Sequence, residues 1–363
     1  MSTVSAILPC YSADTAGVCS ALYEMGGMTV VHDASGCNST YATHDEPRWE
    51  TLQADIYISA LTEIDAIMGN DEKFIADVTA AAHDRRPKFI AICGSPMPMM
   101  TGTDFDAAAA EIGARTGLRC FAMHTNGMQD YITGAAEALL AVTEEYAQMR
   151  EKSRGIGVNI LGATPLDLGL SGTVSSLRAW LTENGFSVVS CLAVGEINLE
   201  NVASASVSLV ISQTGLKAAK YLHARFGIPY VCGLPVGGLK PVIAEALRSA
   251  AKTGTCAYPC ANRRPGDHAV IGEGIIAGSI AAAAGGAVLH PLTCAPEIAA
   301  PADLHVPDEL SVKNALDRLH PAAVTADPLY RYVLPNGTRL NALPHYAFSG
   351  RCFANAIPDL IRK

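Results

Sequence analysis

Short apolar runs rich in β-branched residues alternate along this chain with amphipathic stretches whose apolar positions lie three and four residues apart. The runs have the length of buried strands, and the amphipathic spacing is that of helices with one apolar face. Such alternation predicts parallel sheets covered by helices. In the first third of the chain we expect strands over residues 56–59, 88–93 and 118–124 and helices over residues 104–116 and 129–150.

The same pattern resumes after a charged segment at residues 144–154. Further strands are predicted over residues 155–162, 186–192, 206–212, 229–233 and 268–271. Further helices are predicted over residues 173–184, 216–226, 241–252 and 274–284, with turns over residues 62–71 and 163–172. The pattern therefore predicts an α/β fold of three small Rossmann-like parallel domains at residues 1–153, 154–264 and 265–363, the third one compact.

Composition narrows the classes of function. Of the 363 residues, 49% are hydrophobic and 17% are charged, which supplies apolar surface for more than one core. The formal net charge is −9, without a run of basic residues, so a nucleic-acid partner is not expected. The start of the chain lacks the features of a signal peptide, and the apolar stretch at residues 274–296 is broken by His290 and Pro291. We therefore expect a cytoplasmic protein without a membrane span.

The sequence lacks the motifs of common nucleotide sites. No GxxxxGK[ST] motif occurs, and no GxGxxG follows a predicted strand. The glycine-rich piece GLPVGGLK at residues 233–240 lacks the Lys-Ser/Thr pair that reaches phosphate and Mg²⁺. ATP hydrolysis and dinucleotide binding by this chain are therefore disfavoured, and a redox function would need electrons from another protein.

Three of the eleven cysteines stand where a strand or extended segment gives way to a loop: Cys10, Cys37 and Cys93. Cysteines in a reducing compartment seldom form disulfides, which leaves core packing, catalysis or metal binding as their uses. Thiolates held in loops suit iron–sulfur clusters or zinc. No CxxC pair occurs, however, and from the spacing alone three buried core cysteines are the better interpretation.

Other cysteines and polar residues allow two interpretations each. Apolar or aromatic surroundings predict core positions for Cys19, Cys120, Cys191 and Cys352. Cys232 follows a predicted strand and faces a Gly-rich turn, which would suit a cleft, with core packing as the better interpretation. Cys256 and Cys260 share a Pro-containing loop that could bind a metal, with a structural role as the alternative. The polar segment THDEPRW at residues 43–49 either tunes a nearby cluster or docks an electron donor, or it is a solvated surface.

Several segments occur in the order seen in the component 1 subunits of nitrogenase and its relatives. They are PCYSADTAGVCSALYEMGGMTVVHDASGC, TEIDAIMGND, IAICGSPMPMMTGTDFD, HTNGMQDYITG, GIPYVCGLPVGGLKP and ADPLYRYVLPNGTRLNALPHYAFSGR. The chain resembles this family over nearly its whole length, with a third domain shorter than that of nitrogenase itself.

The resemblance implies a [4Fe-4S] cluster or a P-cluster-like [8Fe-7S] cluster at a subunit interface, with Cys10, Cys37 and Cys93 as its ligands from this chain. Cys10 and Cys37 match the first two ligand positions of the family. Counting back from Gly102, which matches the glycine after the third ligand, places Pro96 at the third position and Cys93 three residues early. Either Cys93 reaches the cluster through a rearranged loop, or the ligand set on this side is incomplete.

Asp130 is a further candidate for the missing ligand, because it lies near a position where some members of the family place an oxygen ligand. An exposed acidic residue at a helix start is the better interpretation.

The resemblance also implies a function and its partners. The chain would be a subunit of a nitrogenase-like oxidoreductase that relays low-potential electrons from an ATP-dependent iron–sulfur reductase to a reducible substrate or metallocofactor. Its second partner would be a homologous component 1 chain, identical or not, which could carry a second metallocofactor. Tetrapyrroles and carbon–sulfur bonds are open as substrates, whereas nitrogen is disfavoured by the short third domain. A non-catalytic scaffold for metallocluster assembly and a small-molecule-binding α/β protein without a cluster stay open as alternatives.

Overall fold

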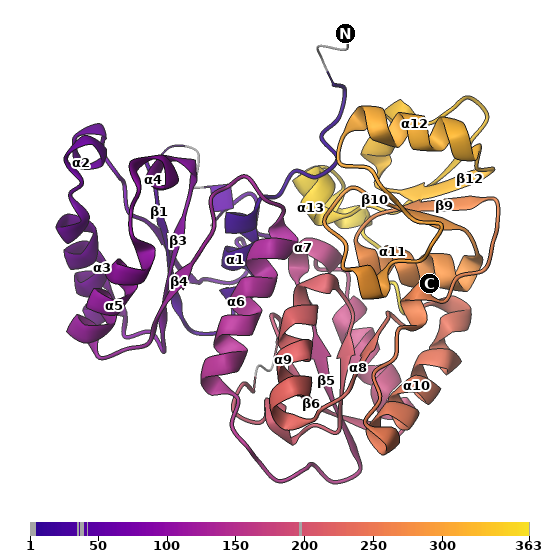
Figure 1. The fold of residues 1–363 in the computed structure, drawn as a ribbon, viewed down its shortest axis with the longest axis horizontal. Coiled ribbons are helices and arrows are strands. Elements are labelled where there is room, and N and C mark those ends of the chain that lie inside the picture. Colours follow the sequence, from indigo (N-terminus) through magenta and orange to yellow (C-terminus); the bar gives the residue numbers. More distant parts are fainter. Residues whose placement is uncertain (1–4, 35, 37–39, 42, 196–197, 363) are drawn as a thin grey trace.

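The computed structural model describes residues 5–34, 36, 40–41, 43–195 and 198–362. These residues form three parallel sheets, each with helices packed against it (Figure 1). The predicted α/β class with three parallel sheets is therefore confirmed. Each sheet lies within one of the three residue ranges expected for the domains, while the boundaries themselves stay predictions.

The first sheet has four parallel strands in the order β2-β1-β3-β4. The strands are β1 (Met28–His32), β2 (Asp55–Ile58), β3 (Ile90–Gly94) and β4 (Cys120–Met123). The helices are α1 (Asp14–Leu22), α2 (Glu63–Met68), α3 (Asp71–Arg85), α4 (Pro96–Thr101), α5 (Phe105–Thr116) and α6 (Tyr131–Tyr146). Apolar side chains of α3 and α5 cover one face of the sheet, and those of α1 and α6 cover the other.

The second sheet has the order β6-β5-β7-β8, and its core is partly shared with that of the first domain. The strands are β5 (Ile156–Leu161), β6 (Phe186–Cys191), β7 (Val207–Val210) and β8 (Tyr230–Cys232). The helices are α7 (Pro165–Leu168), α8 (Thr173–Glu183), α9 (Leu216–Phe226) and α10 (Lys240–Thr253). Because α9 packs against α6, one continuous apolar cluster joins the first two domains.

The third sheet has five strands in the order β11-β10-β9-β12-β13. The strands are β9 (His268–Ile271), β10 (Ala287–His290), β11 (Leu304–His305), β12 (Ala323–Ala326) and β13 (Arg339–Ala342), with helices α11 (Gly274–Ala284), α12 (Glu309–Leu319) and α13 (Tyr346–Ser349). The long apolar stretch at residues 274–296 thus becomes a buried helix and a strand. Within the residues that the structure describes, no helix combines the length and apolar character needed to cross a membrane.

The segments near both ends of the chain form hydrogen bonds with a domain other than their own. The amide of Ile7 donates to the Glu309 carboxylate over 2.8 Å, and the amides of Tyr11 and Ser12 donate to the carbonyl of Ala347 over 2.9 and 3.0 Å. At the other end, the amide of Leu360 donates to Thr173 at the start of α8. The segment at residues 6–12, expected within the first domain, therefore lies against the third (Figure 1).

One segment expected to be a turn contains a helix. The Thr62 hydroxyl accepts the amide of Asp65 over 3.1 Å and so caps the start of α2. The helix ends at Gly69, whose φ of 65° is readily adopted by glycine. Six residues are too few for a periodic signal, so local capping rather than periodicity defines α2.

Two glycines allow α1 and α6 to approach each other at backbone distance. All nine residues of α1 are buried. A Cβ on Gly17 would lie 2.0 Å from the carbonyl oxygen of Tyr131, and a Cβ on Gly134 would lie 2.0 Å from that of Asp14. Because backbone atoms cannot move aside as a flexible side chain can, glycine is required at both positions.

We expect Gly17→Ala to lower the free energy of unfolding by about 1–3 kcal/mol, because the added methyl group forces the two helices apart. Urea denaturation followed by circular dichroism measures the change. Gly238→Ala is the control, since its Cβ would meet nothing within 4 Å. Equal stability of Gly17→Ala and the wild type would contradict the close packing of α1 on α6.

Candidate functional site

Cys10 lies in the extended segment before α1, between the first and third domains. Its Sγ lies 3.5 Å from the carbonyl oxygen of Ser12 and 3.4 Å from that of Ala347. The side chain is half-buried and packs beside the apolar cluster of the third domain. Burial, and then the nearby carboxylate of Asp130, raise the pKa of the Cys10 thiol. A metal bound there has to displace the proton, because the thiolate is the ligand.

Cys93 has the environment of a core residue. Its side chain is fully buried among apolar residues of α1 and α6, and its Sγ lies 3.7 Å from the carbonyl oxygen of Val30. A hydrogen bond with Cys19 of α1, and then burial, raise the pKa of the Cys93 thiol well above its ordinary value. Cys93 is the next-to-last residue of β3, close to the strand end predicted for it.

The structure describes two of the three predicted ligands, Cys10 and Cys93. Cys10 and Cys93 belong to different apolar clusters, and Cys37 lies outside the described residues. In the described part of the chain, no group of three or more Cys, His, Asp or Glu side chains is placed to hold a metal ion. The position of Cys10 suits a ligand at a domain edge, whereas Pro96, exposed at the start of α4, offers no donor. The packing of Cys93 thus favours an incomplete ligand set, and the three-cysteine assignment stays a prediction.

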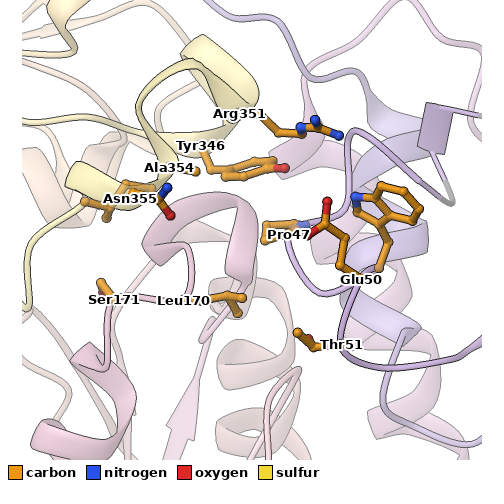
Figure 2. Close-up of a pocket in the computed structure, with 11 residues that line it drawn as sticks. Pro47, Glu50, Thr51, Leu170, Ser171, Tyr346, Arg351, Ala354 and Asn355 are labelled. Atoms are coloured by element: carbon orange, nitrogen blue, oxygen red, sulfur yellow. The ribbon is translucent and has the colours of Figure 1, made fainter.

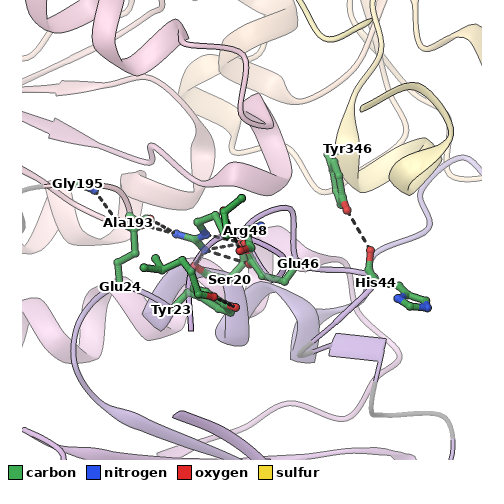
Figure 3. Close-up of polar contacts among 11 residues, drawn as sticks. Ser20, Tyr23, Glu24, His44, Glu46, Arg48, Ala193, Gly195 and Tyr346 are labelled. Carbon is green, nitrogen blue, oxygen red and sulfur yellow. Dashed lines mark hydrogen bonds and ion pairs between the residues drawn. The ribbon is translucent and has the colours of Figure 1, made fainter. Parts of the chain in front are cut away.

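A buried ion pair holds the segment that follows the Cys37 loop (Figure 3). The Arg48 guanidinium contacts both carboxylate oxygens of Glu46, with Nε–Oε1 at 2.6 Å and Nη2–Oε2 at 3.0 Å. It also contacts Glu24 over 2.8 Å and donates to the carbonyl oxygens of Ser20 and Ala193 over 2.6 and 3.0 Å. Because Ala193 belongs to the second domain, residues 46–48 are held by contacts with two domains. They do not form a solvated surface.

The same segment contacts the third domain. The Tyr346 hydroxyl donates to the carbonyl oxygen of His44 over 3.0 Å, and Nη1 of Arg351 lies 3.3 Å from Nδ1 of His44 (Figure 3 shows the first contact). All three domains therefore position residues 44–48. His44 itself is exposed, whereas Glu46 and Arg48 have structural roles.

A second buried polar group lies at the junction of the three domains and was missed from the sequence. The Tyr131 hydroxyl donates to Asp167, and Nε2 of His345 lies 3.5 Å from the same carboxylate. The other carboxylate oxygen of Asp167 has no hydrogen-bond partner among the described residues. Asp167 lies in the segment expected to be a turn, so nothing in the sequence pattern indicated that it would be buried.

The Asp130 carboxylate forms hydrogen bonds with two backbone amides. One of its oxygens accepts the amide of Thr133 over 3.1 Å and so caps α6, while the other accepts the amide of Thr293 over 2.9 Å. The helix-start interpretation therefore accounts for one oxygen and a contact with the third domain for the other, and the side chain is half-buried rather than exposed.

Most of the remaining cysteines pack in the interior. Buried positions are occupied by Cys19, Cys120, Cys191, Cys232 and Cys260. Cys256 is half-buried and its sulfur accepts the amide of Tyr230 over 3.5 Å, a structural contact. The prediction of a core position for Cys352 is wrong, because the side chain is exposed in the 3₁₀ helix that follows α13 (Gly350–Ala356).

A polar cleft opens where the three domains meet (Figure 2). It has a volume of about 650 Å³, within the range of small-molecule sites. Its lining combines an aromatic pair, a cation and an amide: Trp49, Tyr346, Arg351 and Asn355. Glu50 of the first domain and Ser171 of the second complete the polar wall. Neither of the predicted ligands that the structure describes lines this cleft. The fold class predicts ligand sites in clefts between domains, but the lining residues of this cleft were not foreseen from the sequence.

The family described as nitrogenase component 1 type oxidoreductase has a model that matches residues 14–242, more than half of the chain. The chain belongs to this family. Membership in the nitrogenase component 1 type family confirms the resemblance found in the sequence. A solved structure of nitrogenase Cp1 at pH 6.5 superposes on 97% of this chain and 89% of that chain, with a TM-score of 0.67 and 13% sequence identity. This likeness shows that the fold is shared.

Curated relatives of the chain are subunits of light-independent protochlorophyllide reductase. The relative from Chlorobium luteolum is 34% identical over 107 residues, which cover 28% of this chain and 20% of that protein. The relative from Chlorobium phaeovibrioides, which has the same name, is 27% identical over 222 residues, which cover 58% of this chain and 41% of that protein. The chain thus spans less than half the length of these relatives.

We expect Arg48→Met to lower the free energy of unfolding by about 3–5 kcal/mol, because it leaves the Glu46 carboxylate buried without its partner. Thermal and urea unfolding measure this loss. Arg115→Met is the matched control: Arg115 forms its ion pairs with Glu72 and Glu111 at the surface, where they contribute little. A loss no larger in Arg48→Met than in the control would contradict the structural role of the buried pair.

His32 predicts how stability depends on pH. Burial lowers its pKa from the ordinary 6.5 to about 4, and its Nδ1 lies 2.8 Å from the Ser59 hydroxyl. The unfolded chain binds the proton more tightly than the folded one, so stability present above pH 6.5 is lost as the pH falls towards 4. His32→Asn should remove about 3 kcal/mol of this acid-induced loss. Urea midpoints between pH 7 and pH 4 measure it, with exposed His83→Asn expected to follow the wild type; parallel profiles for all three would contradict the prediction.

Proposed function

We propose that this chain is a subunit of a nitrogenase-like oxidoreductase that carries an iron–sulfur cluster at a subunit interface. The match of the family model over residues 14–242 carries the proposal. The cluster would supply one-electron transfer at low potential. An ATP-dependent iron–sulfur reductase would deliver the electrons, in keeping with the absence of a P-loop motif from this sequence.

The proposed ligands from this chain are Cys10 and Cys37. Cys10 is fixed by neighbours on two sides, because the amides of Tyr11 and Ser12 bind the third domain and α1 begins a few residues later. The segment after Cys37 is fixed by Arg48 and Glu46 at the domain junction. The attachment beside Cys10 does not involve the thiol itself, so the backbone could hold this ligand in position before a metal binds.

A homologous component 1 chain, identical to this one or not, would complete the ligand set. A cubane cluster usually takes four protein ligands, and two or three come from this chain. The packing of Cys93 in the core supports the smaller number. A two-fold or pseudo-two-fold interface is the economical way to supply the remainder.

The cleft of Figure 2 is the proposed place for the substrate. The exposed guanidinium of Arg351 could bind an acidic group, while Trp49 and Tyr346 offer aromatic faces to a flat ring system. The relatives are named as subunits of protochlorophyllide reductase, and protochlorophyllide is a tetrapyrrole. Their name therefore favours a tetrapyrrole over a carbon–sulfur bond as the substrate. The Tyr131–Asp167–His345 group would hold the three domains in a fixed arrangement around the cleft.

We expect Cys10→Ala and Cys37→Ala each to lower bound iron and sulfide at least twofold, because thiolates hold such clusters. Anaerobic purification followed by iron and sulfide assays and electron paramagnetic resonance measures the loss. Cys120→Ala, which removes a buried thiol of the same domain, should keep the wild-type iron content. Cys93→Ala should also keep it if the ligand set is incomplete. Full iron in both ligand variants would contradict the assignment.

The alternative functions predict different results for the same purified protein. A colourless wild-type chain without iron after cluster reconstitution would support a small-molecule-binding protein instead. A cluster that is transferred to another protein, without ATP-dependent turnover in the presence of the cognate reductase, would support an assembly scaffold.

A further inference from the structure

Strand β4 forms an open edge of the first sheet. It is the last strand in the order β2-β1-β3-β4, and it pairs with β3 on one side only. The carbonyl of Arg119, just before β4, accepts the amide of Ile90 in β3 over 2.9 Å. Because backbone groups alternate in direction along a strand, the amides and carbonyls of Cys120 and Ala122 point to the open side. Among the residues that the structure describes, no strand pairs with that side.

The other edge strands carry features that discourage pairing with another chain, such as charge, a register shift or short length. Asp55 lies on β2 and Arg339 on β13. A register shift interrupts the pairing of β6, β11 has only two residues, and Ala257 covers the outer side of β8. Strand β4 reads CFAM, has no charged residue and pairs without a register shift. An unprotected edge of this kind is a template for an added strand.

A groove of about 510 Å³ runs along the open side of β4. Helix α5 forms one wall with Ala109, Ala110 and Gly113, and α6 contributes Ala141 to the other. Figure 1 shows β4 between these two helices. Neighbouring strands lie roughly 4.8 Å apart, so an added strand has to fit between the helices, and the small side chains of both walls leave space for it.

The two ends of the groove carry opposite charges. At the amino end of β4, the Arg119 side chain is 56% exposed and pairs with Glu145 over 3.1 Å, which leaves further guanidinium donors for a partner. At the carboxyl end, the ring of His124 lies 3.2 Å from Asp106 and 3.3 Å from Glu137. Two carboxylates face one imidazole, so this end stays negative whether or not His124 is protonated.

This charge pattern selects the partner. When two copies of β4 pair antiparallel about a two-fold axis, the amino end of each strand lies against the carboxyl end of the other. Arg119 of each copy then meets Asp106 and Glu137 of its partner, so the contact is self-complementary, as a two-fold interface must be. Parallel pairing would place like charges together instead.

We propose that β4 pairs antiparallel with β4 of a second copy of this chain, so that the first sheets of two copies form one continuous sheet. Cys10 does not line the groove, and the contact is additional to the one proposed to complete a cluster. The amide of His124 already donates to Glu137 over 2.9 Å, which limits the free edge to a short stretch. The expected dimer is therefore reversible and depends on protein concentration.

Charge reversal at the two ends of the groove tests the inference. Arg119→Glu and Asp106→Arg each place like charges together, and we expect each to raise the dissociation constant of the dimer about tenfold or more. Sedimentation velocity over a concentration series measures it. An equimolar mixture of the two variants should associate again, because each reversed end then meets the opposite charge. Arg85→Glu is the matched control: Arg85 is 54% exposed and pairs with Asp55 at the other edge of the same sheet.

Hydrogen–deuterium exchange reports on the strand itself. In the wild type, the amides of residues 119–123 should become better protected as the protein concentration rises, and in Arg119→Glu they should not. Equal association of both variants and the wild type, or a mixture that does not associate, would overturn the inference. Protection that is the same at every concentration would mean that another part of the same chain covers the edge, and would also overturn it.

Iron and sulfide assays on the same variants keep this test apart from the proposed function. Neither Arg119 nor Asp106 is a proposed ligand, so both variants should keep the iron content of the wild type. A failed association test with full iron would overturn the strand pairing alone. A wild-type chain that forms this dimer and binds no iron would support the pairing and contradict the proposed function.

Discussion

The contact between α1 and α6 at backbone distance is the constraint on which much of the molecule depends. It is possible because Gly17 and Gly134 leave room for the carbonyl groups of the facing helix. Helix α6 then packs on α9 and joins the first two domains into one core. At the start of α1, the Asp14 carboxylate accepts the amides of Asn126 and Gly127 over 3.0 and 2.8 Å, which ties the helix to the end of β4. The entry of the chain into α1 fixes where Cys10 lies.

The polar interior has a related role. Arg48 joins the first domain to the second, and the neighbouring His44 carbonyl receives a hydrogen bond from the third domain. Buried charges of this kind contribute little to stability compared with apolar packing, but removing one partner is costly. Such a pair specifies one arrangement of the domains, and with it the shape of the cleft between them. The shape of the cleft and the position of residues 44–48 therefore depend on the same few polar contacts.

Much of the fold could be predicted from the sequence, because strands and long helices have strong periodic signals. The predicted helices over residues 216–226 and 274–284 coincide with α9 and α11. The site was harder to predict. Cys10 and Cys93 both stand near strand or segment ends, and only packing separates a half-buried thiol at a domain edge from one enclosed beside Cys19. The cleft and the Asp167 group are formed by residues far apart in sequence, so no local pattern could indicate them.

The attachment of the N-terminal segment to the third domain has a consequence for biosynthesis. The partners of residues 6–12 lie more than 300 positions further along the chain: Ile7 binds Glu309, and Tyr11 and Ser12 bind Ala347. A ribosome makes the amino terminus first, so this segment has no place to bind until nearly the whole polypeptide has emerged. Cys10 consequently gains its final surroundings as one of the last events of folding. Truncated products that end before Ala347 would leave the thiol without one of the two carbonyl groups that it contacts.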